Sequence, residues 1–276
     1  MVQVTTTDRR GVLRAGAGLV AGGALAAGCS SAGTAPHPAA SDASPGSPSG
    51  PSADGASGSP RPAAHASAAP APRHFPGQPA QISHGPRDKP HVALTFHGQG
   101  DPALARTLLT TAEKHGARVT VLAVGTWLDA HPEVARRILD GGHDLGNHTQ
   151  RHLSVNDMSE ADARAEITGC ADRLQRLTGS IGTWFRPSRA VTASPLVERL
   201  ARAAGYPHVL SYDVDSLDYT SPGAAAVTRN VLSAIRGGSV VSLHFGYPGT
   251  ATALPDLLTE LDRRGLRAVT TTELLS

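Results

Sequence analysis

The sequence predicts an α/β fold, a distorted or incomplete (β/α) barrel of about seven units, within residues 88–276. Short apolar runs alternate there with longer amphipathic segments. Proline opens most of the amphipathic segments and glycine follows most of them, which is typical of helix boundaries. Strands that alternate with helices pair in parallel through right-handed crossovers, so the chain forms either a barrel or an open doubly wound sheet. The number of units favours the barrel.

This pattern places each strand and helix along the chain. The expected strands lie at residues 92–96, 118–124, 143–145, 183–185, 208–212, 239–243 and 266–269. The expected helices lie at residues 102–114, 132–140, 160–178, 195–204, 222–236 and 254–264. A domain of this length can bury one substantial core.

Residues 1–28 are expected to be an export signal rather than part of the fold. A basic start that includes Arg9 and Arg10 precedes an apolar stretch that is too short to span a bilayer. The paired arginines resemble a twin-arginine signal, and the residues up to Cys29 resemble a lipobox, although Ala26 stands where an aliphatic residue is usual. The sequence therefore predicts a lipoprotein held by a lipid on Cys29 at the outer face of the cytoplasmic membrane. The alternative is a general secretory signal with no lipid, which gives a secreted protein.

Residues 29–87 are expected to form a disordered linker. They consist mainly of Ala, Pro, Ser and Gly, and Phe75 and Ile82 are their only large apolar residues. Such a composition buries too little apolar surface to offset the conformational entropy lost on folding. We expect this segment to tether the folded domain, residues 88–276, above the membrane.

Charge and cysteine content argue against nucleic-acid binding and against a disulfide bond at Cys170. Removal of residues 1–28 takes away three arginines and one aspartate, so the formal net charge falls from +2 to 0. No basic stripe indicates nucleic-acid binding. Cys170 has no partner once Cys29 belongs to the signal, and its place in an expected helix indicates a small buried apolar side chain.

Two histidines four residues apart, His148 and His152, give the strongest indication of chemistry. They follow a glycine turn and a short apolar run, and a spacing of about one helical turn lets both imidazoles face the same point. Imidazole nitrogens are common ligands of zinc. The pair predicts a divalent metal site, with zinc as the first choice and cobalt or another first-row ion as alternatives.

Further polar residues follow other expected strands at their carboxyl ends, where the loops of an α/β barrel form its site. These residues are His97, Arg186, Asp215, Asp218 and His244. Each has an ordinary explanation by itself, such as a surface ion pair for Arg186 or a turn for Asp218. Their matching positions in successive units indicate that they line one pocket together with the histidine pair.

These motifs resemble those of the polysaccharide deacetylase family, the NodB-homology domain of carbohydrate esterase family 4. The resemblance covers residues 90–276 and rests on motifs that occur in the order of the family, at residues 142–152, 185–187, 214–219 and 243–244. Tyr219 stands in place of the usual tryptophan. The resemblance implies a distorted barrel and metal-dependent removal of acetyl groups from an extracellular polysaccharide such as peptidoglycan or a chitin-like glycan.

The first motif departs from the family. The family has Thr-Phe-Asp-Asp-Gly, in which the first aspartate is the general base and the second is a metal ligand, whereas this chain has His97 and Gly98 at those positions. In one arrangement, His97 completes a three-histidine site and Asp101 serves as the base. In the other, Asp101 is the third ligand and His97 is the base. We favour the first, because the glycines of the turn permit a close approach of Asp101.

The resemblance also implies the remaining roles. His244 would protonate the departing amine, Asp218 would orient His244, and the backbone amide of Arg189 would stabilise the developing oxyanion. Arg186 would pair with the carboxylate of the base. The altered first motif leaves open a catalytically impaired, glycan-binding relative. A serine esterase finds no support, because residues 88–276 contain no Gly-x-Ser-x-Gly motif.

Overall fold

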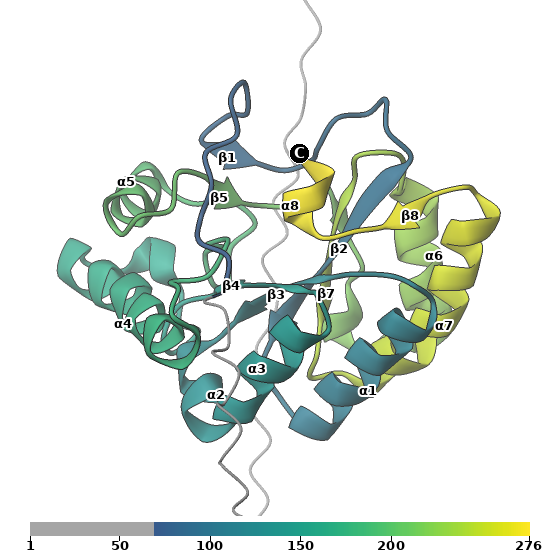
Figure 1. The fold of residues 1–276 in the computed structure, drawn as a ribbon, viewed down its shortest axis with the longest axis horizontal. Helices are drawn as coiled ribbons and strands as arrows, with labels where there is room; N and C mark the ends of the chain where they lie inside the picture. The colour runs from purple at the N-terminus through teal and green to yellow at the C-terminus, as the bar shows by residue number, and fades with distance from the viewer. Residues whose placement is uncertain (1–68) are drawn as a thin grey trace, which may run out of the picture. The chain divides into compact units, whose positions relative to one another are not determined.

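A parallel β-sheet forms the centre of residues 69–276, the part of the chain that this computed structural model describes (Figure 1). The strand order is β4-β3-β2-β7-β6, with β8 paired to β2, and every pair is parallel. These strands are β2 (His91–Gly98), β3 (Thr120–Ala123), β4 (Asp144–Asn147), β6 (Val214–Asp215), β7 (Val240–His244) and β8 (Arg267–Ala268).

Isolated β-bridges extend this sheet into a distorted barrel. Two short strands, β1 (Gln81–Ile82) and β5 (Val209–Leu210), pair in parallel beside it. Phe185 makes parallel bridges to Asn147 and Val209 and so joins β4 to β5. The expected strand at 183–185 is therefore reduced to this one residue. The predicted α/β fold with a distorted, incomplete barrel is confirmed.

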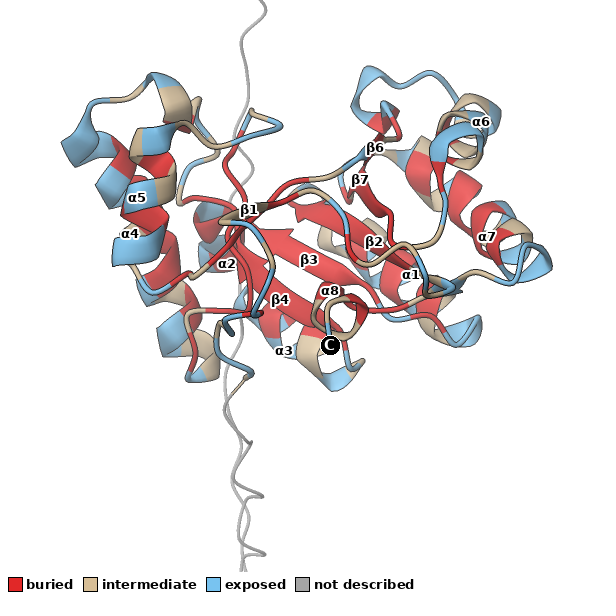
Figure 2. Cartoon of the chain, turned by 90° about the horizontal axis from the view of Figure 1, so that it is seen from above, coloured by how far each residue is buried: buried red, intermediate tan, exposed pale blue. Residues whose placement is uncertain are grey.

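Eight helices accompany the sheet within the described residues. They are α1 (Pro102–Lys114), α2 (Gly125–Ala130), α3 (Pro132–Asp140), α4 (Glu160–Thr178), α5 (Pro195–Ala203), α6 (Ala224–Ala234), α7 (Pro248–Arg263) and α8 (Thr271–Leu274). The strands are almost wholly buried, while the helices bury one side and expose the other (Figure 2). This is the layering that an amphipathic pattern predicts.

Three helices end and begin where the sequence predicts, and a proline or a side-chain cap marks the start of each. Helices α1, α3 and α4 have the expected bounds, and Asp101 and Ser159 cap two of them. The expected start of α7 at residue 254 is wrong, because the helix begins at Pro248 and continues through Pro255. The short elements β1, β6, α2 and α8 were not expected, since none is long enough to show a periodic pattern.

The linker assigned to residues 29–87 is wrong for residues 69–87, which belong to the folded unit. The Phe75 side chain is 5% exposed and stacks on Trp184, with ring centroids 5.4 Å apart. The Phe75 amide donates to His208 Nε2 at 3.0 Å, and Ile82 is fully buried in β1. The barrel supplies the apolar surface that covers both side chains, and average composition does not reveal this. The rest of the linker, the export signal and Cys29 lie outside the described residues.

The main core lies between the sheet and helices α1, α3 and α7. Cys170 is fully buried there, as expected, and burial raises the pKa of its thiol to about 12. A thiol with such a pKa is unreactive at neutral pH. Among the described residues, no helix has the length and apolar character needed to cross a membrane.

Candidate metal centre and active site

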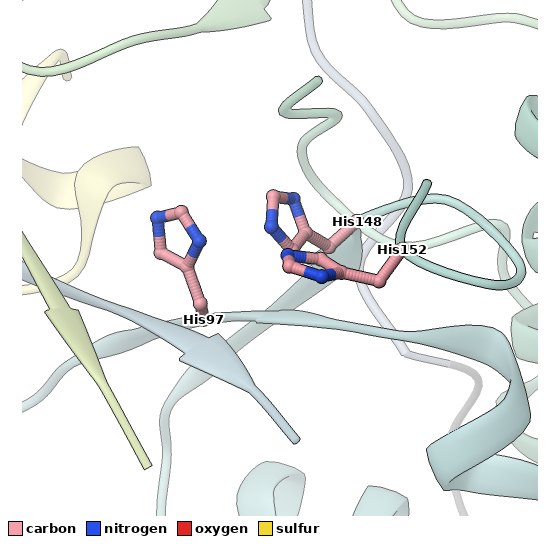
Figure 3. A group of neighbouring side chains, drawn as sticks. All are labelled: His97, His148 and His152. Carbon is pink, nitrogen blue, oxygen red and sulfur yellow. The ribbon is translucent and has the colours of Figure 1, made fainter. Parts of the chain in front are cut away.

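Three histidines meet at the carboxyl ends of β2 and β4. His97 lies near the end of β2, His148 directly follows β4, and His152 lies in the loop beyond it. Each offers a ring nitrogen, and these three nitrogens lie within 4.8 Å of one another. Figure 3 shows the three rings grouped around one point. Three imidazoles with room for a further ligand are a donor set that suits catalytic zinc.

The ring of His148 has one nitrogen in use and one free. Its Nδ1 donates to the Arg186 carbonyl oxygen at 3.0 Å, which leaves the lone pair on Nε2. His148 is fully buried, and its Nε2 has no hydrogen-bond partner among the described residues. A buried polar atom without a partner is costly unless something binds it. The orphaned Nε2 therefore fits a metal ligand.

The Nε2 side of the His97 ring faces Arg186 and Ser242. Its Nε2 lies 3.3 Å from Arg186 Nη1 and 3.2 Å from Ser242 Oγ. This leaves Nδ1 for the side that faces His148 (Figure 3). A metal on Nδ1 requires the proton of His97 to lie on Nε2, and the hydroxyl of Ser242 is the acceptor within reach there.

Burial keeps all three rings neutral. It holds the pKa values of His97 and His148 well below 6.5, and the neighbouring histidines lower them further. Burial, followed by the nearby charge of Arg189, lowers the pKa of His152 to about 4. Neutral imidazoles present free lone pairs, so the triad can bind a cation at neutral pH without first losing protons.

Glu166 of α4, which the sequence analysis missed, holds the loop that carries His148 and His152. Its side chain is 1% exposed and accepts from the Arg151 amide at 2.8 Å and from Arg151 Nε at 2.5 Å. Thr149 and His152 both have left-handed backbone, with φ values of 68° and 57°. These bonds offset the cost of that conformation. The signal that could have identified Glu166 in the sequence is its position as an acidic residue on the apolar face of the predicted helix at 160–178.

His244 and Asp218 form a second polar pair beside the triad. His244 Nδ1 donates to Asp218 Oδ1 at 2.6 Å, and the His244 amide and Thr250 Oγ1 donate to Asp218 Oδ2 at 2.8 and 2.6 Å. The Asp218 side chain is fully buried, whereas that of His244 is 14% exposed. The carboxylate fixes the ring of His244 and turns its Nε2 outward, as the sequence analysis expected of this pair.

Arg186 is fully buried without a carboxylate partner. Its guanidinium donates to the carbonyl oxygens of Leu210 and Ser211 and to Thr95 Oγ1, at 3.1, 2.9 and 2.8 Å. Burial lowers the pKa of this guanidinium to about 9. The expected ion pair with a carboxylate base is therefore not formed. The Arg186 guanidinium instead bonds to neutral oxygen atoms, and its Nη1 lies 3.3 Å from His97 Nε2.

Asp101 does not join the triad. Its side chain caps α1 by accepting from the Ala103 amide at 2.8 Å, and it is exposed. The group of residues that could hold a metal contains His97 in its place. The structure thus groups His97 with His148 and His152, the ligand set of the first arrangement. Asp101, the base of that arrangement, lies at the start of α1.

A pocket opens above the triad and His244. Its walls include Arg189, Val191, Tyr212, Asp215, Tyr219 and Tyr247. Tyr212, Tyr219 and Tyr247 give the pocket aromatic walls. Three further aromatic residues, Trp127, Trp184 and Phe245, are buried in the core.

Comparison with known proteins adds independent findings. Residues 84–209 match the family described as polysaccharide deacetylase. The chain is 29% identical over 194 residues to a peptidoglycan-N-acetylglucosamine deacetylase of Bacillus cereus, and the match covers 69% of this chain and 90% of that protein.

Two solved structures are similar to this one. The Bc1960 peptidoglycan N-acetylglucosamine deacetylase has a TM-score of 0.66 and 27% identity, and the match covers 71% of this chain and 92% of that one. A CE4 family pseudoenzyme from Bacillus anthracis has a TM-score of 0.67 and 26% identity, with 72% and 70% covered. The fold therefore occurs both in an enzyme and in a pseudoenzyme.

Proposed function

Because this chain belongs to the polysaccharide deacetylase family, we propose that it is a metal-dependent hydrolase that removes acetyl groups from an extracellular glycan such as peptidoglycan. N-acetyl groups are the main substrate, and O-acetyl groups are a second class. The observation that carries the proposal is the free, buried Nε2 of His148, which faces His97 and His152 beside the outward Nε2 of His244. Zinc is the proposed ion.

The residues divide the work of hydrolysis. His97, His148 and His152 would hold a divalent ion. When bound, such an ion would polarise the acetyl carbonyl and make water easier to deprotonate. His244 passes a proton from Nε2 to the departing amine, and Asp218 keeps the ring in that orientation. The amide of Arg189 donates to the carbonyl oxygen as negative charge develops on it.

Asp101 is the proposed general base, as the sequence predicts. To act as the base it must leave its cap on α1, where its carboxylate accepts from the Ala103 amide. Asp101→Ala is expected to keep metal binding and lose turnover. Full turnover in this variant would remove Asp101 from the mechanism.

A catalytically impaired glycan-binding protein is the second candidate. The observation in its favour is the loss of both aspartates of the first motif at His97 and Gly98, together with the similarity to a pseudoenzyme. A Cβ at position 98 would lie 2.9 Å from Val121 Cγ1 and 3.1 Å from Ala123 Cα, so an aspartate there would require β3 to shift.

Acetate release distinguishes the two candidates. The purified chain is loaded with zinc or cobalt and incubated with acetylated chitooligosaccharides, peptidoglycan and acetylxylan. Release that disappears in Asp218→Asn, with the metal still bound, supports the enzyme. Glycan binding without release from any substrate would instead establish the second candidate.

Export and lipid attachment complete the proposal. The signal in residues 1–28 would deliver the protein across the membrane, and a lipid on Cys29 would hold it on the outer face. Cys29→Ser is expected to release the protein from the membrane fraction and to remove the added mass of the lipid. Membrane attachment that survives this change would contradict the assignment.

A further inference from the structure

Two arginines and two aspartates lie in the walls of the pocket or directly behind them. Arg186 lies buried behind His97, and Arg189 is exposed at the wall of the pocket. Among the residues that line the pocket, only Asp215 carries a carboxylate. Asp218 lies behind His244, and three hydrogen bonds already occupy it. A divalent ion held by the three neutral histidines would make the sum of these charges positive, and a positive potential attracts anions.

The segment that carries Arg189 is fixed on both sides. The hydroxyl of Ser188, which is fully buried, donates to the Leu153 carbonyl oxygen and accepts from Thr149 Oγ1. On the other side, Ser211 Oγ donates to the Val191 carbonyl oxygen at 2.6 Å. Arg189 itself has left-handed backbone, with a φ of 54°. Its side chain therefore starts from a defined place beside His152.

No described residue pairs with the guanidinium of Arg189. Arg189 and His152 line the same pocket. A cation beside a proposed metal ligand opposes the binding of a second cation, so this position has an electrostatic cost. An anionic group of the ligand would offset that cost and form the two parallel hydrogen bonds that guanidinium and carboxylate favour.

We propose that Arg189 is a specificity-determining residue that binds a carboxylate of the glycan, so the preferred substrates are acidic acetylated glycans rather than neutral ones. The carboxylate has two chemical sources, a lactyl ether on the acetylated sugar, as in peptidoglycan, or a neighbouring uronic acid. This inference rests on the proposed function, because it concerns the substrate of the same pocket.

Binding to the metal-free chain tests the inference separately from catalysis. Calorimetry compares peptide-free peptidoglycan oligosaccharides with the same oligosaccharides after their carboxylates are converted to amides. The acidic form is expected to bind about tenfold more tightly, the size of one charge-assisted hydrogen-bonded pair. Acetylated oligosaccharides that contain uronic acid form a second arm, and the tighter of the two acidic ligands identifies the source.

Substitutions then assign the preference to Arg189. Arg189→Gln is expected to bind the acidic and amidated forms equally, while Arg189→Lys keeps part of the preference and loses it as salt is added. Asp215→Asn is a further variant with the opposite expected sign, because it removes the carboxylate from the pocket and should strengthen binding of the acidic form. Equal binding of the two forms by the unaltered chain, or an unchanged preference in Arg189→Gln, would overturn the inference. An absence of acetate release would leave these binding results intact.

Discussion

The two histidines at opposite ends of β4 differ in a way that separates structure from function. His143, just before the strand, uses both ring nitrogens: Nδ1 accepts from the Val119 amide and Nε2 donates to Glu113 Oε1, each at 3.1 Å. His148, just after the strand, uses Nδ1 and leaves Nε2 buried without a partner among the described residues. Both rings are buried, so exposure does not distinguish them. The two histidines differ instead in that only His148 has a ring nitrogen, Nε2, without a hydrogen-bond partner among the described residues.

The comparison has a general consequence for parallel sheets. The amino end of β4 is covered by α1 and α3, whose side chains can satisfy a buried ring. The carboxyl end opens into loops, where ligands bind in α/β barrels. A histidine at the amino end therefore finds hydrogen-bond partners for both ring nitrogens within the core. A histidine at the carboxyl end can keep a free lone pair on one nitrogen.

The largest expected effect concerns the free nitrogen of His148. His148→Ala is expected to reduce zinc affinity by at least about a hundredfold, because one of three ligands is lost. Competition with a coloured chelator measures the affinity, and acetate release should disappear with the metal. The matched control is His143→Phe, which should leave zinc affinity unchanged but destabilise the fold by roughly 1–3 kcal/mol, since the Val119 amide loses its acceptor. Equal loss of zinc in both variants would show that the comparison is wrong.

An intermediate effect is expected from the carboxylate that braces the loop of His148. Glu166→Gln places an amide against donors of Arg151 and leaves one of them without an acceptor. Zinc affinity should fall about tenfold, as is usual when a group behind the ligands is lost. Glu160→Gln is the control, because Glu160 lies on the same helix and pairs with Arg164 and Arg199 at the surface. An unchanged affinity in Glu166→Gln would reduce Glu166 to a purely structural ion pair.

The smallest expected effect is a change in the pH dependence of stability. Burial holds the pKa of His152 at about 4, below its value of about 6.5 in the unfolded chain. The unfolded state therefore binds more protons below pH 6.5, and the metal-free protein should lose stability as the pH falls from 6.5 towards 4. In His152→Gln, denaturant unfolding between these pH values should show a slope smaller by up to one proton. An identical slope would mean that the His152 ring is already charged in the folded protein.

The sequence by itself determined the local features. Caps, N-terminal prolines and terminal glycines act within a few residues, so the bounds of α1, α3 and α4 could be predicted. The spacing of His148 and His152 also lies within one loop, and it was enough to predict two of the three candidate ligands. The order of the later motifs was sufficient to indicate the resemblance to the polysaccharide deacetylase family.

The tertiary structure decided what depends on distant segments. The sequence favoured His97 over Asp101 as third ligand but left both open, whereas the barrel brings His97 beside His148 and Ser242 and leaves Asp101 at the cap of α1. The burial of Phe75 and the neutral partners of Arg186 follow in the same way from surfaces that only the folded barrel brings together. Local propensity cannot predict such contacts, because their energy comes from groups far apart in the chain.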